Sequence, residues 1–83
     1  MNAIEKIGGI IFVLDEDASE KYITTYRAEH NLNQYRITVD NTTSMPYYDL
    51  FLEYKEGKRH LHNHLFSTGQ MEKLSDWIGR NIA

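Results

Sequence analysis

The chain has no cysteine and a single proline among its 83 residues. Without cysteine it can form no disulfide, offer no thiolate nucleophile and build no cysteine-based zinc site. Its longest apolar run, residues 10–14, is too short to span a bilayer. The first residues lack the basic region and the small-residue cleavage site of a signal peptide. We therefore expect a cytoplasmic protein with no membrane association.

Basic side chains are in the minority, with 9 Lys and Arg against 12 Asp and Glu and a net charge of −3. Affinity for nucleic acid comes largely from phosphate neutralisation, so this balance argues against a general nucleic-acid binder. Protonation of the four histidines would reverse the sign of the net charge in the mildly acidic range.

The length predicts one domain, 1–83, that buries only about 60% of the surface exposed by the unfolded chain. Its stability is expected to be modest. A contact with a protein partner, or a homodimer contact, would add to it.

Residues 47–66 show the clearest pattern in the chain, and they predict a β-hairpin. Apolar residues alternate on both arms around the polar break 55–58, and we place the tip at Glu56-Gly57. This register pairs Leu52 with Leu61 and Tyr48 with Leu65 on one face. On the other face it pairs Glu53 with His60, Phe51 with His62, and Asp49 with His64.

Residues 34–40 alternate in the same way and predict a third strand. Tyr35, Ile37 and Val39 share one face, while Arg36 lies on the other. Pro46 marks the entry to the hairpin, and an antiparallel connection brings Asp40 opposite Tyr47. The strands 34–40, 47–54 and 59–66 then form a meander in which Arg36 neighbours Phe51.

The C-terminal segment 68–82 predicts an amphipathic helix. Ser67 and Gln70 fit a capping box, and Phe66 and Met71 fit a hydrophobic staple. The apolar stripe of the helix is expected to pack on the sheet face that carries Leu52 and Leu61; it comprises Met71, Leu74, Trp77, Ile78 and Ile82. Strict alternation, however, would turn Phe66 toward the opposite face.

The N-terminal half is less clearly patterned. The run 9–14 favours a strand covered on both faces, because Gly8-Gly9 would weaken a helix; one N-terminal amphipathic helix is the alternative. For 18–30 the pair Asp17 and Glu20 and the four-residue apolar spacing slightly favour a helix, whereas the block 22–26 favours a strand. The prediction is an α+β fold with an antiparallel sheet of three to five strands and the helix on one face.

The pattern His60-x-His62-x-His64 raises the question of a metal site. Histidines four apart on a strand lie about 13 Å apart, so the three cannot share one ion held at about 2 Å. A site would need one adjacent pair with Asp49 or with His30. We expect no metal and no cofactor, with a histidine-based metal-binding or hydrolytic site kept as the alternative.

Catalysis has little support in the sequence. His64 beside Asp49 could orient a general base, but the pattern places no Ser or Cys nucleophile and contains no glycine-rich phosphate loop. We therefore expect a protein that is not an enzyme.

The face that carries the histidines combines aromatic anchors with a polar rim, which is typical of protein-recognition sites. Basic side chains beside aromatic ones also fit a weak RNA- or ssDNA-binding sheet, although the carboxylates in the same patch oppose it. The size, acidity and lack of cysteine are typical of small regulators, inhibitors and immunity or anti-defence proteins of phages and mobile elements. We expect a non-enzymatic module that binds one protein partner through Arg36, Tyr47, Asp49, Phe51, Glu53, His60, His62 and His64.

Overall fold

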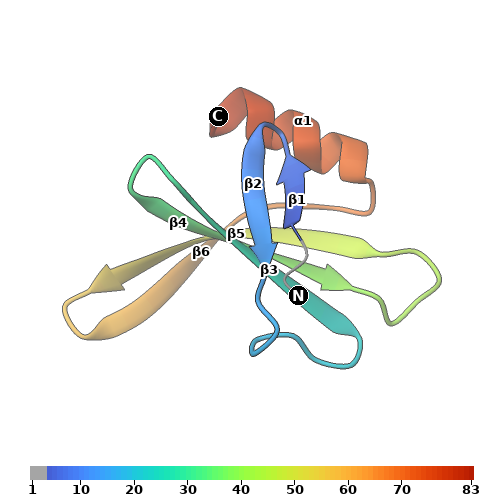
Figure 1. Ribbon diagram of the computed structural model, residues 1–83, viewed down its shortest axis with the longest axis horizontal. Coiled ribbons are helices and arrows are strands. Elements are labelled where there is room, and N and C mark those ends of the chain that lie inside the picture. Colours follow the sequence, from blue (N-terminus) through green and yellow to red (C-terminus); the bar gives the residue numbers. More distant parts are fainter. Residues whose placement is uncertain (1–3) are drawn as a thin grey trace.

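A computed structural model describes residues 4–83 and shows an α+β fold with one antiparallel sheet and one helix (Figure 1). Six strands follow one another in the sheet in sequence order, so the predicted class is confirmed and the predicted three to five strands are too few. The elements are β1 (Ile4–Ile7), β2 (Ile10–Leu14), β3 (Ile23–His30), β4 (Asn33–Asp40), β5 (Tyr47–Glu56), β6 (Arg59–Thr68) and α1 (Met71–Asn81).

Gly8 and Gly9 join β1 to β2 with φ angles of 60° and 90°, as a two-residue hairpin turn requires. The predicted strand at 9–14 is confirmed as β2, and the alternative of one N-terminal helix is wrong for the residues from Ile4 onward. The prediction that this strand is covered on both faces is also wrong. Phe12 is buried, while Ile11 between the buried positions is 58% exposed.

The predicted helix at 18–30 is wrong, because Ile23–His30 forms β3 and pairs with β4 along its whole length. The acidic residues before it form a loop instead of a helix start. Asp15 accepts a hydrogen bond from the N–H of Ala18, and its carbonyl accepts one from the hydroxyl of Ser19. The β-forming residues and the partner strand β4 thus outweigh the helical spacing.

The pairing of β4 with β5 follows the predicted register. Asp40 lies opposite Tyr47 and Arg36 lies opposite Phe51. Alternate residues of β4 from Tyr35 onward are buried, which confirms the predicted division into two faces.

The predicted register of β5 with β6 is wrong by two residues. The tip is Gly57-Lys58, with Gly57 at φ 62°, because a turn with glycine at its first central position suits a two-residue hairpin. Glu53 therefore lies opposite His62, and Phe51 lies opposite His64. A shift of two residues leaves the side chains between the hairpin tip and His64 on their predicted faces.

A β-bulge then changes the register a second time. Phe51 lies opposite His64, but Leu50 lies opposite Phe66, so β6 contains an additional residue at Leu65. Phe66 consequently faces inward and stacks on Trp77 of α1, with ring centroids 5.4 Å apart. The bulge resolves the conflict between strict alternation and an inward Phe66.

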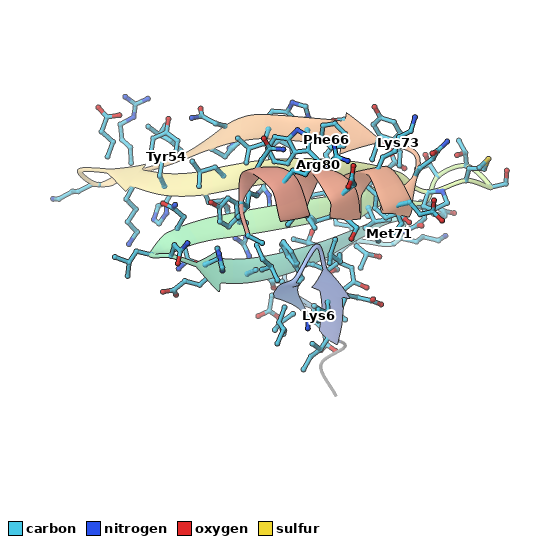
Figure 2. The ribbon with its side chains drawn as sticks, turned by 90° about the horizontal axis from the view of Figure 1, so that it is seen from above. Lys6, Tyr54, Phe66, Met71, Lys73 and Arg80 are labelled. Atoms are coloured by element: carbon cyan, nitrogen blue, oxygen red, sulfur yellow. The ribbon has the colours of Figure 1, made fainter. Side chains whose placement is uncertain are left out.

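Helix α1 begins at Met71, later than predicted. Ser67 and Thr68 belong to β6, and the N-cap residue Gln70 makes no side-chain cap, so the predicted capping box is wrong. Phe66, which the sequence predicts to pack against the helix through Met71, stacks on Trp77 of the same helix. Figure 2 shows α1 lying in front of the sheet, with Phe66 beside it.

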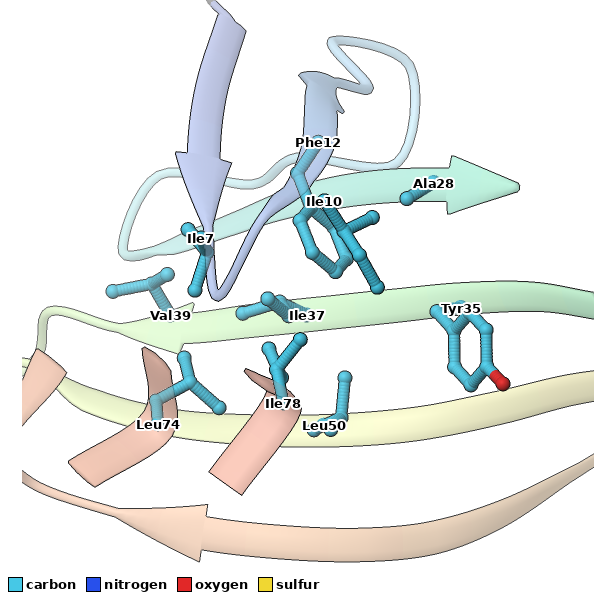
Figure 3. Close-up of a cluster of buried hydrophobic side chains, with 10 residues drawn as sticks. All are labelled: Ile7, Ile10, Phe12, Ala28, Tyr35, Ile37, Val39, Leu50, Leu74 and Ile78. Carbon is cyan, nitrogen blue, oxygen red and sulfur yellow. The ribbon is translucent and has the colours of Figure 1, made fainter. Parts of the chain in front are cut away.

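The helix covers the predicted face of the sheet, but it lies further from the β5–β6 tip than expected. Leu74 and Ile78 are fully buried beside Leu50 (Figure 3), while Leu52 is only partly buried at the margin and Leu61 lies outside this core. The core comprises Ile7, Ile10, Phe12, Ala28, Tyr35, Ile37, Val39, Leu50, Leu74 and Ile78. In residues 4–83 no helix is long and apolar enough to cross a membrane.

Candidate functional site

The sheet face opposite α1, here called the outer face, carries a half-buried aromatic ring. Phe51 projects from β5, and the guanidinium of Arg36 on β4 lies 4.8 Å from the centre of its ring. The imidazoles of His62 and His64 on β6 meet the ring edge-on, each with its centroid 5.4 Å away. Side chains from three strands thus surround one phenyl ring on the face opposite the helix.

The geometry of this cluster follows from the strand pairing. His64 lies directly opposite Phe51, and His62 lies one diagonal step away on the same face. The predicted contact between Phe51 and His62 therefore exists, although it is diagonal rather than direct. A guanidinium over an aromatic ring and T-shaped contacts between aromatic rings are both attractive arrangements.

A network of charges lies beside the ring. Glu53 is clamped between two guanidiniums, because Arg27 donates a hydrogen bond to its Oε1 and Nη1 of Arg36 lies 3.6 Å from its Oε2. Nε of Arg27 also donates to Oδ2 of Asp15 at 2.6 Å. This bond, together with the N–H of Ala18, holds the pKa of Asp15 below its ordinary value. The network fixes the polar rim next to Phe51.

A second polar group lies at the other side of the ring. The hydroxyl of Ser67 donates a hydrogen bond to Oδ1 of Asp49 and shares another with Nε2 of His64. The distance from Nε2 of His64 to the same carboxylate oxygen is 3.4 Å. In a hydrolytic triad the imidazole lies between the hydroxyl and the carboxylate, whereas here the hydroxyl lies between the other two groups. The hydroxyl of Ser67 thus links the imidazole and the carboxylate and holds the three side chains together on the outer face.

The structure brings together most of the predicted site residues. One cluster, here called the outer-face cluster, contains Arg36, Asp49, Phe51, Glu53, His62 and His64. His60 lies outside it, opposite Lys55 near the tip of the β5–β6 hairpin. Tyr47 shares the face but lies at the far end of β5, 47% exposed.

Sequence reasoning missed three residues that complete the cluster. Arg27 and Asp15 are not among the predicted site residues, because a helix at 18–30 gives them no place on the sheet. A strand there, paired with β4, places Arg27 beside Arg36. Ser67 is not among the predicted site residues, because the sequence predicts a helix cap at this position and the structure places it in β6. Each omission follows from an incorrect element assignment rather than from an unusual residue.

The histidines do not converge on a point. His30 follows the inward parity of Ala28 on β3, so it does not join the histidines of β6 on the outer face. Within residues 4–83, no group of three or more His, Asp or Glu side chains is arranged to hold a metal ion.

Comparisons of the chain with protein-family models, with curated proteins and with solved structures found no match.

Proposed function

We propose that this chain is a small non-enzymatic binding module, of the regulator or inhibitor type, that binds one protein partner through the outer-face cluster. The observation that supports the proposal is the half-buried Phe51, which Arg36, His62 and His64 surround on the sheet face opposite α1. Aromatic and arginine side chains dominate the binding energy of protein interfaces, and a polar rim around them excludes water. The cluster contains both components.

The charge of the cluster favours a protein over a nucleic acid. Asp49 and Glu53 lie among the cationic and aromatic groups, and Glu53 is engaged by both Arg27 and Arg36. A phosphate backbone would meet these carboxylates and would gain little from guanidiniums that are already paired. A protein surface of mixed charge can satisfy both signs.

The test begins with capture of the partner. The wild-type chain and the double variant Phe51→Ala/His62→Ala are immobilised and exposed to an extract of the cells that produce the protein. The retained protein is identified, purified and titrated by calorimetry. We expect the double variant to lose about 2 kcal/mol or more of binding free energy, because it removes the aromatic anchor and an adjacent ring.

Two controls separate binding from folding. Lys73→Ala changes an exposed residue of α1 and should leave affinity unchanged. Leu50→Ala changes the fully buried neighbour of Phe51 and should lower the melting temperature far more than Phe51→Ala. Equal affinity of the folded double variant and the wild type, or retention of no protein by the wild type, would contradict the proposal.

A further inference from the structure

A small cleft lies on the sheet face that α1 covers, here called the inner face. Strand β2 pairs with β3 through Val13 and Leu14 at its end, so the rest of the β1–β2 hairpin bends away from β3 and lies over this face (Figure 3). The N–H of Gly8 in its turn donates a hydrogen bond to Oγ of Ser75 at 3.0 Å, which ties the hairpin to the helix. A cleft of about 170 Å³ remains between the hairpin, the sheet and the start of α1. It is lined by Glu5, Ile7, Tyr26, Ile37, Val39, Tyr48 and Met71.

The floor of this cleft is apolar and two of its sides are aromatic. Ile37 and Val39 of β4 are buried and form the floor, with Ile7 of the hairpin beside them (Figure 3). Tyr26 on β3 lies opposite Ile37, and Tyr48 on β5 lies opposite Val39, so the two tyrosines flank β4. Both tyrosines are only partly buried, and each leaves part of its ring at the cleft.

The charge at the cleft is negative. Among the described residues that line it, Glu5 is the one charged side chain, and no Lys, Arg or His accompanies it. Glu5 is exposed, and within residues 4–83 it forms no ion pair. Burial raises the pKa of the Tyr26 phenol, and the charge of Glu5 raises it further. The carboxylate thus acts on an aromatic cleft without a cation to balance it.

These groups suit an alkylated ammonium ion. The faces of aromatic rings attract cations, and quaternary ammonium groups are bound between such rings. Met71 at the start of α1 adds a polarizable thioether, which packs well against methyl groups (Figure 2). A primary ammonium group is strongly hydrated and would need hydrogen-bond acceptors that the apolar floor lacks. Methyl groups on the nitrogen remove that need.

The size of the cleft agrees with this chemistry. A water molecule takes about 30 Å³ in the liquid, so the cleft has room for about five or six non-hydrogen atoms. A trimethylammonium group with the carbon that carries it has this size.

We propose that the cleft binds a quaternary ammonium group, with Tyr26 and Tyr48 at its sides and Glu5 as its counter-charge. Choline and the trimethyllysine side chain of a protein present this same group. The cleft lies on the face opposite the outer-face cluster, so the proposal goes beyond the proposed function and does not depend on it.

The first probes are choline and its uncharged analogue, in which a tert-butyl group replaces the trimethylammonium group. Each is titrated into the intact chain, and binding is followed by changes in NMR signals. We expect choline to bind at least about tenfold more tightly than the analogue, with the signals of Tyr26, Tyr48 and Met71 changing.

A glycine-flanked trimethyllysine peptide distinguishes the two sources of the ammonium group. Tighter binding of this peptide than of choline would identify a protein side chain as the ligand, and weaker binding would identify a small molecule. The same peptide with unmodified lysine should bind more weakly than the trimethyllysine peptide, because its ammonium group must shed bound water.

Variants of Glu5 test the counter-charge. Glu5→Gln should weaken choline binding by about tenfold and leave binding of the uncharged analogue unchanged. Glu56→Gln makes the same change at the exposed tip of the β5–β6 hairpin, away from the cleft, and should alter neither.

Variants of Tyr48 test the aromatic wall. Tyr48→Leu removes the ring face but keeps an apolar side chain, so it should abolish most of the preference for choline over the analogue. Tyr48→Phe keeps the ring and should keep the preference. Tyr48 also packs against the core, so melting temperatures are measured alongside. The ratio of the two affinities reports on the ring, because a loss of folded protein lowers both affinities alike.

Equal binding of choline and its uncharged analogue would overturn this proposal and leave a plain apolar cleft. An effect of Glu56→Gln equal to that of Glu5→Gln, or signal changes centred on the outer face, would also overturn it. The proposed function fails separately, because capture of the protein partner is tested at Phe51 and His62, which do not line the cleft.

Discussion

Leu50 lies directly across the strand pair from Phe66, although the next residue along β5 faces two positions further back on β6. This bulge divides β6 into two parts that make different contacts. Before it, His62 and His64 contact Phe51 on the outer face. After it, Phe66 turns inward and stacks on Trp77. One additional residue therefore allows a single strand to serve both the candidate site and the docking of α1.

The inward position of Phe66 can be tested by truncation. Phe66→Ala should cost roughly 2–3 kcal/mol, somewhat below the value for a fully buried phenylalanine, because it removes the stack on Trp77. His64→Ala, two residues earlier and exposed, should cost much less. Urea denaturation of both variants measures the difference, and equal costs would mean that Phe66 does not dock the helix.

The packing of α1 predicts a second contrast. Leu74 is fully buried against the sheet, so Leu74→Ala should cost about 2–5 kcal/mol through lost contacts and the cavity that remains. Met71 lies on the same helix but is 37% exposed, and Met71→Ala should have a small effect. If the two variants melt at the same temperature, the helix is not docked through Leu74.

Two features of the structure favour glycine at position 8: its positive φ and its close contact with α1. Gly57 shares only the first of them. An added Cβ at Gly8 would lie 2.6 Å from the carbonyl oxygen of Ser75 and 2.7 Å from Cβ of Ile78, and its φ is 60°. Gly57 has nearly the same φ, 62°, but nothing within 4 Å of an added Cβ.

Gly57→Ala should therefore cost only the backbone strain, about 1–2 kcal/mol. Gly8→Ala should cost clearly more, because α1 must also move away from the β1–β2 turn. Thermal melts of the two variants decide this, and a Gly57→Ala effect as large as that of Gly8→Ala would show that the turn and the helix are not in close contact.

The ion pair between Arg27 and Asp15 predicts a pH dependence of stability. The hydrogen bond from Arg27 lowers the pKa of Asp15 in the folded state. The ion pair therefore contributes fully to stability above the pKa of Asp15 in the unfolded state, about 3.9. This contribution is lost as the pH falls through the lower pKa of the folded state. Between about pH 5 and about pH 2, the melting temperature of the wild type should fall more steeply than that of Asp15→Asn.

The matched control is Asp17→Asn, which removes a neighbouring carboxylate that makes no side-chain hydrogen bond within residues 4–83. Its pH profile should follow that of the wild type. Parallel profiles for Asp15→Asn and the wild type would show that the pair with Arg27 does not stabilise the fold.

The sequence carries enough information for the faces of the meander but not for its full register. Alternation assigns Phe51 and Leu50 to opposite faces, and the pairing of Asp40 with Tyr47 follows from the short connection through Pro46. The tip of the next hairpin depends on whether Gly57 is the first or second turn residue, which alternation does not determine. The conflict between strict alternation and an inward Phe66 indicates an irregularity near the end of β6, but the spacing alone does not place the bulge at Leu65.

The error at 18–30 has a different origin. The spacing of Ala18, Tyr22 and Tyr26 fits a helix, whereas the β-forming residues 22–26 fit a strand. Local sequence leaves the two states close in free energy, and pairing with β4 decides between them. Arg27 could not be placed at the candidate site until this strand was known.

Side-chain footprinting of the complex with the captured partner tests the proposed binding surface most directly. Hydroxyl radicals oxidise exposed aromatic, histidine and methionine side chains, and a bound partner shields those it covers. We predict that the partner reduces oxidation of Phe51, His62 and His64, and leaves that of Met71 on α1 unchanged. Protection centred on α1 or on the exposed Ile4 and Ile11 of the β1–β2 hairpin, with Phe51 still reactive, would contradict binding through the outer-face cluster.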